Sequence, residues 1–299
     1  MCEMLSVTGL EKRFGDKEVL KGLELCVPEH SVFGFIGKNG AGKTTTMKMI
    51  LGLLKPDAGE ISVAGENVVY GQTRTNRHIG YLPDVPEFYP FMTALEYLYF
   101  CGEITGMDRT ELRVRSRELL ELVGLGDEKH RIKGFSRGMK QRLGIAQALL
   151  NRPKLLICDE PTSALDPVGR KEILDILQAA KEQTTVLFST HILSDVERIC
   201  TDIAFLSDGV VSVQGKLSDV KARYRTEEYL VETVQECDAI RLTERFFGCR
   251  REGCLVVLRG EENLVFDVLH FVAEQRIPVS KVERMEPSLE TLFMEVADR

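Results

Sequence analysis

The spacing of apolar positions predicts a succession of strands and helices through the first 222 residues. The continuous apolar runs SVFGFIG (31–37), KLLICDE (154–160) and TTVLFSTH (184–191) are typical of parallel strands that are buried on both faces. Elsewhere apolar residues recur at helical spacing, and we expect helices over about 43–54, 93–104, 110–123, 136–150 and 167–182. Strands that alternate with helices in this way indicate a parallel sheet built from βαβ units.

Shorter β-like runs accompany these elements. Leu23, Leu25 and Val27 alternate with other residues, and EISVAG (60–65) is a further strand-like run. The run IAFLSDGVVSVQG (203–215) contains Asp-Gly between apolar stretches, which predicts a hairpin. Alternating, half-buried strands are therefore expected beside the continuous buried ones.

The pattern changes near 223–228, which predicts a domain boundary. The remaining segment carries three β-like runs, Tyr229–Val234, Cys254–Arg259 and Pro278–Arg284, interleaved with helical ones. We expect a first domain over 1–222 and a small α/β domain over 228–299.

Composition narrows the class of protein. The chain has 299 residues, a net charge of −7 and a pI near 5.5, which argues against broad nucleic-acid binding. Apolar runs fall short of the roughly 18 residues that span a bilayer, and no signal-peptide pattern follows the N-terminus. None of the eight cysteines forms a C-x-x-C pair, so we expect free or buried thiols in a reducing cytoplasm.

The segment GKNGAGKT, Gly37 to Thr44, fits the pattern of a phosphate-binding loop between a strand and a helix. Its glycines let backbone N–H groups face the oxygens of a polyphosphate. Lys43 would neutralise the outer phosphates, and the Thr44 hydroxyl would reach Mg²⁺. The segment predicts binding of ATP or GTP.

Polar residues end two of the buried strands. Asp159 and Glu160 close KLLICDE, and His191 closes TTVLFSTH. Ligands are expected at the carboxyl ends of parallel strands. Asp159 therefore suits the Mg²⁺ shell, Glu160 suits deprotonation of a water, and His191 suits a contact with the γ-phosphate.

Helix starts are marked by capping residues. Thr93 with Glu96 forms a capping box, and Asp166 precedes Pro167 at a first helical position. Ser136 occupies the N-cap of FSRGMKQRLGIAQALL, whose apolar face would be buried. The start of that helix offers free N–H groups and a positive dipole end, a second potential anion site.

Four motifs, GKNGAGKT, FSRGMKQR, LLICDEPTSALD and STH, occur in the order and spacing of the ATPase subunit of ABC transporters. The chain resembles that family over about residues 4–220. The resemblance implies a P-loop NTPase ABC ATPase core of the α/β class, with a parallel sheet, an antiparallel N-terminal β subdomain and an inserted helical subdomain at about 86–150. The small C-terminal α/β domain would be an addition to this core.

The resemblance also assigns roles to residues. ATP would be cradled by the phosphate loop, with Phe14 against adenine and Mg²⁺ held by Thr44, Asp159 and Asp84. Glu160 would be the general base, with His191 and Asp84 beside it. Two subunits pack head to tail in this family, so the signature residues Ser136 and Gly138, with Asp166, would act at the partner's ATP. The cradle would consist of Gly37, Asn39, Gly40, Ala41, Gly42, Lys43, Thr44 and Thr45.

Two positions depart from the common family pattern. Arg137 replaces the first glycine of the signature, and its bulk must point away from a closed dimer interface. Asp84 stands where the family usually has Gln, which contacts Mg²⁺ and the attacking water. A side chain one methylene shorter would need a bridging water to reach them. Hydrolysis is still expected.

The expected partners are a second ATPase subunit, the same or related, and a separately encoded transmembrane permease contacting Val85–Phe91. The ATPase would lie peripherally on the inner face of the cell membrane, without nucleic acid. MEPSLETLFMEV near the C-terminus resembles the tail of multidrug and antibiotic exporters, which implies export. A soluble ABC ATPase acting on DNA or ribosomes and a low-turnover nucleotide sensor remain alternatives. Association with a membrane partner would distinguish an exporter subunit from the soluble ATPase, and ATP turnover would distinguish it from the nucleotide sensor.

Overall fold

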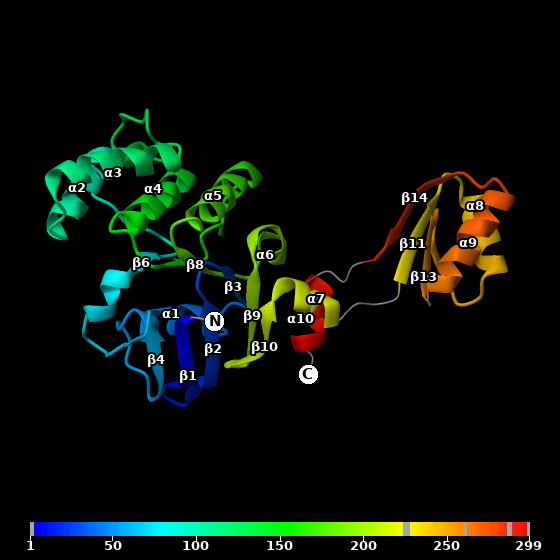
Figure 1. The fold of residues 1–299 in the computed structure, drawn as a ribbon, viewed down its shortest axis with the longest axis horizontal. Helices are drawn as coiled ribbons and strands as arrows, with labels where there is room; N and C mark the ends of the chain where they lie inside the picture. Colours follow the sequence, from blue (N-terminus) through cyan, green and yellow to red (C-terminus); the bar gives the residue numbers. More distant parts are fainter. Residues whose placement is uncertain (1–2, 224–227, 260–261, 286–288, 298–299) are drawn as a thin grey trace. The chain divides into compact units, whose positions relative to one another are not determined.

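A computed structural model describes residues 3–223, 228–259, 262–285 and 289–297, and the larger part of the chain is built around a six-stranded sheet (Figure 1). Its strand order is β10-β9-β3-β8-β7-β6. Neighbouring strands are parallel, apart from the antiparallel hairpin of β9 and β10. The strands are β3 (Val32–Gly37), β6 (Ile79–Leu82), β7 (Leu155–Asp159), β8 (Thr185–Thr190), β9 (Asp202–Ser207) and β10 (Val210–Lys216). The predicted parallel sheet and hairpin are therefore confirmed.

A second sheet is antiparallel and has the strand order β2-β1-β4-β5. Along the chain, β1 and β2 come before β3, and β4 and β5 lie between β3 and β6. In β2, Leu20, Leu23, Leu25 and Val27 are buried while their neighbours are less so, as the alternation predicted. This is the antiparallel N-terminal β subdomain expected from the resemblance. Its strands are β1 (Glu3–Phe14), β2 (Lys17–Pro28), β4 (Ala58–Val63) and β5 (Glu66–Asn67).

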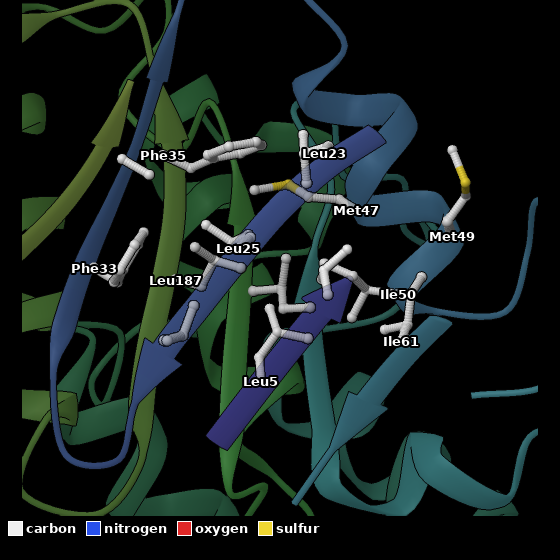
Figure 2. Close-up of a cluster of buried hydrophobic side chains, with 14 of the residues drawn as sticks. Leu5, Leu23, Leu25, Phe33, Phe35, Met47, Met49, Ile50, Ile61 and Leu187 are labelled. Atoms are coloured by element: carbon white, nitrogen blue, oxygen red, sulfur yellow. The ribbon is translucent and has the colours of Figure 1, made fainter. Parts of the chain in front are cut away.

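The main core lies where these two sheets meet around helix α1 (Lys43–Ile50). Figure 2 shows Met47 and Ile50 of α1 among Leu5 and Leu23 of the antiparallel sheet and Phe35 of β3. All five of these side chains are completely buried. Close packing of this kind makes α1 and the loop before it rigid, because a displaced core side chain would leave a void.

Three helices are inserted between β6 and β7, and Figure 1 shows them grouped together. The predicted capping box of Thr93 and Glu96 is present at the first helix, and Ser136 is the N-cap of the third. The inserted helical subdomain is therefore confirmed. Its helices are α2 (Ala94–Ile104), α3 (Arg109–Leu122) and α4 (Arg137–Leu149), with the 3₁₀ turn η2 (Ile132–Gly134) between α3 and α4. A further 3₁₀ turn, η1 (Arg74–His78), precedes β6.

The rest of this part differs from expectation in the end of one helix and in two short helices that were not predicted. Helix α1 ends at Ile50 rather than near 54, and Gly52, at φ +70°, follows its end. Helix α6 (Leu193–Ile199) was not predicted, because seven residues are too few to show a helical period. Helix α5 (Pro167–Ala180) starts at the predicted Asp166 cap. Helix α7 (Leu217–Arg223), which also has seven residues, was not predicted either.

The chain divides into two compact units: one runs up to Ser218 and includes the C-terminal residues from Glu295, and the other is Asp219–Met294. The second contains a βαββαβ succession. Its antiparallel sheet has the order β12-β13-β11-β14, and its core joins Tyr229 and Val231 of β11 to Leu242 and Val268 of the helices. Strand β12 was not predicted; it has three exposed residues. The elements are β11 (Glu228–Thr233), α8 (Glu236–Arg245), β12 (Arg250–Glu252), β13 (Leu255–Arg259), α9 (Glu262–Glu274) and β14 (Val279–Arg284), followed by α10 (Leu289–Ala297).

Two sequence interpretations fall partly outside the described residues. These are the boundary segment, of which 224–227 are not described, and the tail motif, of which 286–288 are not. Within the described ranges, the structure contains no helix with the length and apolar character needed to cross a membrane.

Candidate active site

The phosphate loop leaves β3 at Gly37 and enters α1 at Lys43. A Cβ atom on Gly42, where φ is +112°, would lie 2.7 Å from the Leu20 side chain. A Cβ atom on Gly37 would lie 2.8 Å from the carbonyl oxygen of Leu206. Both positions therefore require glycine, one for its backbone conformation and both for their close packing. Asn39 and Gly40 are exposed at the tip of the loop, with half-buried Ala41 after them.

Lys43 points back along the loop from the first turn of α1. Its Nζ atom donates hydrogen bonds to the carbonyl oxygens of Gly37 (2.6 Å) and Lys38 (3.3 Å), and lies 3.1 Å from Glu160 Oε1. The residue is only 6% exposed, so its charge is held in a fixed place. A buried ammonium group beside a loop of this shape is suited to the outer phosphates of a nucleotide. Thr45 follows at the same helix end, half-buried.

Asp159 is held by two hydroxyl groups at the end of β7. The Thr44 hydroxyl donates to its Oδ2 atom (2.7 Å), and the Ser189 hydroxyl donates to its Oδ1 atom (2.6 Å). Ser189 Oγ also accepts a hydrogen bond from the backbone N–H of Glu160 (3.0 Å). Ser189, which is completely buried on β8, therefore fixes both acidic residues. Its role was missed from the sequence, where a polar residue within a buried strand was the available signal.

Glu160 has an unusual backbone conformation for a residue with a side chain, with φ at +48°. Its carbonyl oxygen accepts from the Ser163 N–H (3.0 Å), and its Oε2 atom lies 2.9 Å from His191 Nδ1. Its Oε1 atom is buried without an aligned hydrogen-bond donor, although Lys43 Nζ is within ion-pair distance. Strained residues of this kind are concentrated at functional sites, since the surrounding structure must hold them in place.

The oxygens beside the phosphate loop fit the requirements of Mg²⁺. This ion prefers carboxylate, hydroxyl and phosphate oxygens. Thr44 Oγ1, at the start of α1, lies 2.7 Å from Asp159 Oδ2, at the end of β7. Hydrogen bonds and ion pairs join six residues into one network, here called the phosphate cluster: Lys43, Thr44, Asp159, Glu160, Ser189 and His191.

Asp84 follows β6 and lies close enough to the phosphate cluster to interact with it electrostatically. Partial burial raises the pKa of its carboxyl group; Arg137 opposes that rise, and the charges of Asp159 and Glu160 add to it. Arg137 donates a hydrogen bond to Asp84 Oδ1 at 3.3 Å. The two departures from the common family pattern therefore contact each other.

The signature residues lie at the start of α4 rather than in the phosphate cluster. Ser136 Oγ accepts from the backbone N–H of Met139 (3.2 Å), which confirms the predicted N-cap. A Cβ atom on Gly138 would meet Leu165 only at 3.9 Å, so the backbone there is approachable. Among the described contacts, none joins Ser136 or Gly138 to Lys43.

The segment after Glu160 is tied to helix α6 through Asp195. This buried carboxylate accepts from Thr162 Oγ1 (2.7 Å) and from Arg170 Nε (2.5 Å). Asp166 caps α5 by accepting from the Gly169 N–H at 3.1 Å. The sequence interpretation missed Asp195, because its two partners lie 33 and 25 residues away.

Phe14 lies at the end of β1, and its ring is 49% exposed. Lys12 Nζ is 5.5 Å from the ring centroid. An exposed ring can stack on a base, but the described contacts do not connect it to the phosphate cluster. Its assignment to adenine remains a prediction.

Comparison with known proteins gives one family. A sequence model described as ABC transporter matches residues 20–163. The chain is 37% identical to the uncharacterised ABC transporter ATP-binding protein YxlF of Bacillus subtilis (strain 168), over 98% of this chain and 99% of the relative. It is 36% identical to the bacitracin transport ATP-binding protein BcrA of Bacillus licheniformis, over 99% of this chain and 98% of the relative.

A solved structure shares the fold. It is cbiO1 from Clostridium perfringens, described as part of the ABC transporter complex cbiONQ. The TM-score is 0.69 at 27% identity, and the match covers 75% of this chain and 92% of the other. The expected P-loop NTPase core of the ABC type is thereby confirmed. With relatives above 30% identity along almost its whole length, the chain belongs to the ATP-binding proteins of ABC transporters and is an ATPase of that family.

Proposed function

We propose that this ATPase drives an exporter by closing as a dimer on ATP, with Glu160 as the general base. The observation that carries the proposal is the phosphate cluster, which places a lysine, a hydroxyl–carboxylate pair and a glutamate–histidine pair around one loop. These are the groups that phosphoryl transfer to water requires.

The chain's own residues divide the work of hydrolysis. Lys43 and the backbone N–H groups of the loop would bind the phosphates of ATP. Thr44 and Asp159 would hold Mg²⁺, which supplies positive charge to the β- and γ-phosphates. Glu160 would take a proton from the attacking water, and His191, whose Nδ1 atom is turned to Glu160, would present its other ring nitrogen to the γ-phosphate.

The absence of described contacts between the signature helix and Lys43 supports the proposal that the dimer closes on ATP. The start of α4 carries free backbone N–H groups and the positive end of the helix dipole, which stabilises an anion by about 1 kcal/mol. This helix end would contact the γ-phosphate bound to a partner subunit. Ser136, Gly138 and Asp166 would therefore act on the partner's ATP, and ATP would hold two chains together.

A cavity of about 450 Å³ next to Asp84 is the proposed docking place for a transmembrane partner. Val85, which lines the cavity, is 63% exposed to solvent, and Phe91, the residue after the lining residue Pro90, is 60% exposed. Burial of such side chains against a partner is favourable. The complex that contains cbiO1 supports an assembly of this kind. The cavity is lined by Asp84, Val85, Pro86, Glu87, Phe88, Pro90, Ile132, Lys133, Arg137, Lys140 and Gln141.

The proposal also includes the direction of transport, which is export, and a separate role for each part of the chain. The resemblance of the tail and the bacitracin transport protein among the relatives support export. Residues 1–222 would be the ATPase domain on the cytoplasmic face of the membrane, and 228–299 an accessory domain. The presence of a second compact unit, Asp219–Met294, supports a separate domain, although the residues from Glu295 group with the first unit.

Photo-crosslinking tests the partner. A photoreactive phenylalanine analogue would replace Phe91, and Phe247, which is 94% exposed in the second unit, would serve as the control. We expect a crosslink to an integral membrane protein from position 91 and none from 247. A crosslink from position 91 to ribosomal RNA or DNA would instead support the soluble alternative. Absence of ATP turnover by the purified complex would support the nucleotide-sensing alternative.

A further inference from the structure

One face of α4 packs against and hydrogen-bonds to the segment that contains Asp84. Gly144 packs so closely that a Cβ atom there would lie 2.4 Å from the Leu82 side chain. One turn earlier, Gln141 Nε2 donates to the carbonyl oxygen of Asp84 at 2.6 Å. A further turn earlier, Arg137 Nη2 donates to Asp84 Oδ1 at 3.3 Å. Residues at this spacing lie on one side of a helix, so the three contacts form one continuous interface between the helix and the segment.

The two contacts to Asp84 have different consequences. Gln141 is completely buried and holds the main chain, so it sets where residue 84 lies. Arg137 holds the side chain, and both members of that ion pair are exposed, at 43% and 47%. Exposed ion pairs contribute little to folding stability. The Arg137 contact therefore orients the carboxylate without contributing appreciably to the fold.

Orientation matters because Asp84 is next to other carboxylates. Strand β6 pairs with β7 in parallel, with Leu82 opposite Cys158, so Asp84 follows at the same edge of the sheet as Asp159 and Glu160. Lys43 faces Glu160, and Arg137 faces Asp84. Without a cation on its outer side, the Asp84 carboxylate would be repelled by its neighbours toward solvent.

We propose that Arg137 is a positioning residue for Asp84. One departure from the common family sequence would then compensate for the other within the same chain. The helix that would contact the partner's ATP thereby also sets the geometry of this chain's own hydrolytic site. The inference rests on the proposed function, since it assigns Asp84 a part in hydrolysis.

A double-mutant cycle of Arg137→Gln and Asp84→Gln tests the inference. We expect Arg137→Gln to lower kcat about fivefold, with less than about a twofold change in KM for ATP, because orientation rather than binding is lost. In the Asp84→Gln background the same substitution should change kcat by less than about twofold, since no carboxylate remains to be positioned. Arg137→Lys, which keeps a cation, should recover most of the rate.

A second ion pair provides the control. Arg198 donates to Asp175 at 2.8 Å, with side chains that are 39% and 52% exposed, between α6 and α5. Arg198→Gln should leave kcat unchanged. Thermal midpoints of all these variants should agree within about 2 °C, because neither pair is buried.

Equal losses of kcat from Arg137→Gln in both backgrounds would overturn the inference, and would indicate that Arg137 acts on something other than Asp84, such as the partner's nucleotide. A failure of Lys to recover the rate would overturn it too. Failure of the proposed function has a different signature: Glu160→Gln would retain full hydrolysis, whatever the cycle shows.

Discussion

Replacing Ser189 with alanine should disturb the site more than its size suggests. The hydroxyl is completely buried and joins two residues at the end of β7: it donates to Asp159 at 2.6 Å and accepts from the Glu160 N–H at 3.0 Å. Ser189→Ala removes both bonds and leaves the partly buried N–H group of Glu160 without its partner.

The cost can be worked from these two contacts. A hydrogen bond to a charged group contributes about 1.5–3 kcal/mol, and an unsatisfied buried N–H costs about 1–3 kcal/mol. Partial relaxation reduces the sum, so we expect the free energy of unfolding to fall by about 2–4 kcal/mol. Asp159 would keep its bond to Thr44 but lose its orientation. Loss of such a supporting contact typically weakens metal binding about 10-fold or more.

Denaturant unfolding followed by circular dichroism would measure the first effect, and the Mg²⁺ concentration for half-maximal ATPase rate would measure the second. Ser31→Ala is a matched control, because Ser31 is also buried and donates one bond, to the carbonyl oxygen of Pro28 at 2.7 Å, away from the site. It should cost about 1 kcal/mol of stability and leave the Mg²⁺ dependence unchanged. The same Mg²⁺ dependence in Ser189→Ala and the wild type would refute the reasoning.

Two further predictions concern charge and thiol chemistry. Lys43→Ala should abolish ATP binding, because the phosphates lose a buried cation. Near-normal ATP affinity, measured by calorimetry with Mg²⁺ present, would refute the assignment of 37–44 as the phosphate-binding loop. Burial raises the pKa of Cys158 and Cys200 above the usual thiol value, and burial together with Glu3 raises that of Cys26 to about 11. A raised pKa lowers the thiolate fraction at any pH below it. At pH 8 an alkylating reagent should therefore modify exposed Cys237 before Cys158 and Cys200, which it should reach only after unfolding. Peptide mass spectrometry would follow the order, and native labelling of Cys158 as fast as Cys237 would contradict it.

The elements that local pattern predicted well are those that local chemistry determines. The strand–loop–helix of β3 and α1 is specified by an apolar run, glycines and a helical repeat within 20 residues of sequence, and the caps at Thr93, Ser136 and Asp166 depend on neighbours three residues away. Short elements such as α6 and β12 carry too few residues for a period to show.

The parts that could not be predicted depend on pairs distant in sequence. Ser189 contacts Asp159 across 30 residues, and Arg137 contacts Asp84 across 53. From the sequence alone, the bulk of Arg137 is expected to avoid the closed interface, and Asp84 differs from the usual Gln in the length of its side chain. Their contact depends on how α4 packs on the end of β6, which the spacing of apolar residues does not specify.

ATP-dependent dimerisation of Glu160→Gln tests the central claim most directly. The amide keeps the shape of the carboxylate but cannot take a proton, so hydrolysis should slow about 10²-fold or more while ATP still binds. Size-exclusion chromatography with Mg-ATP should then show a shift from monomer to dimer, which the wild type shows little of because turnover reopens the pair. The double variant Glu160→Gln/Ser136→Arg should stay monomeric, since the start of α4 is blocked. An unchanged hydrolysis rate would exclude Glu160 as the base, and a slow variant that remains monomeric with ATP would contradict closure driven by the nucleotide.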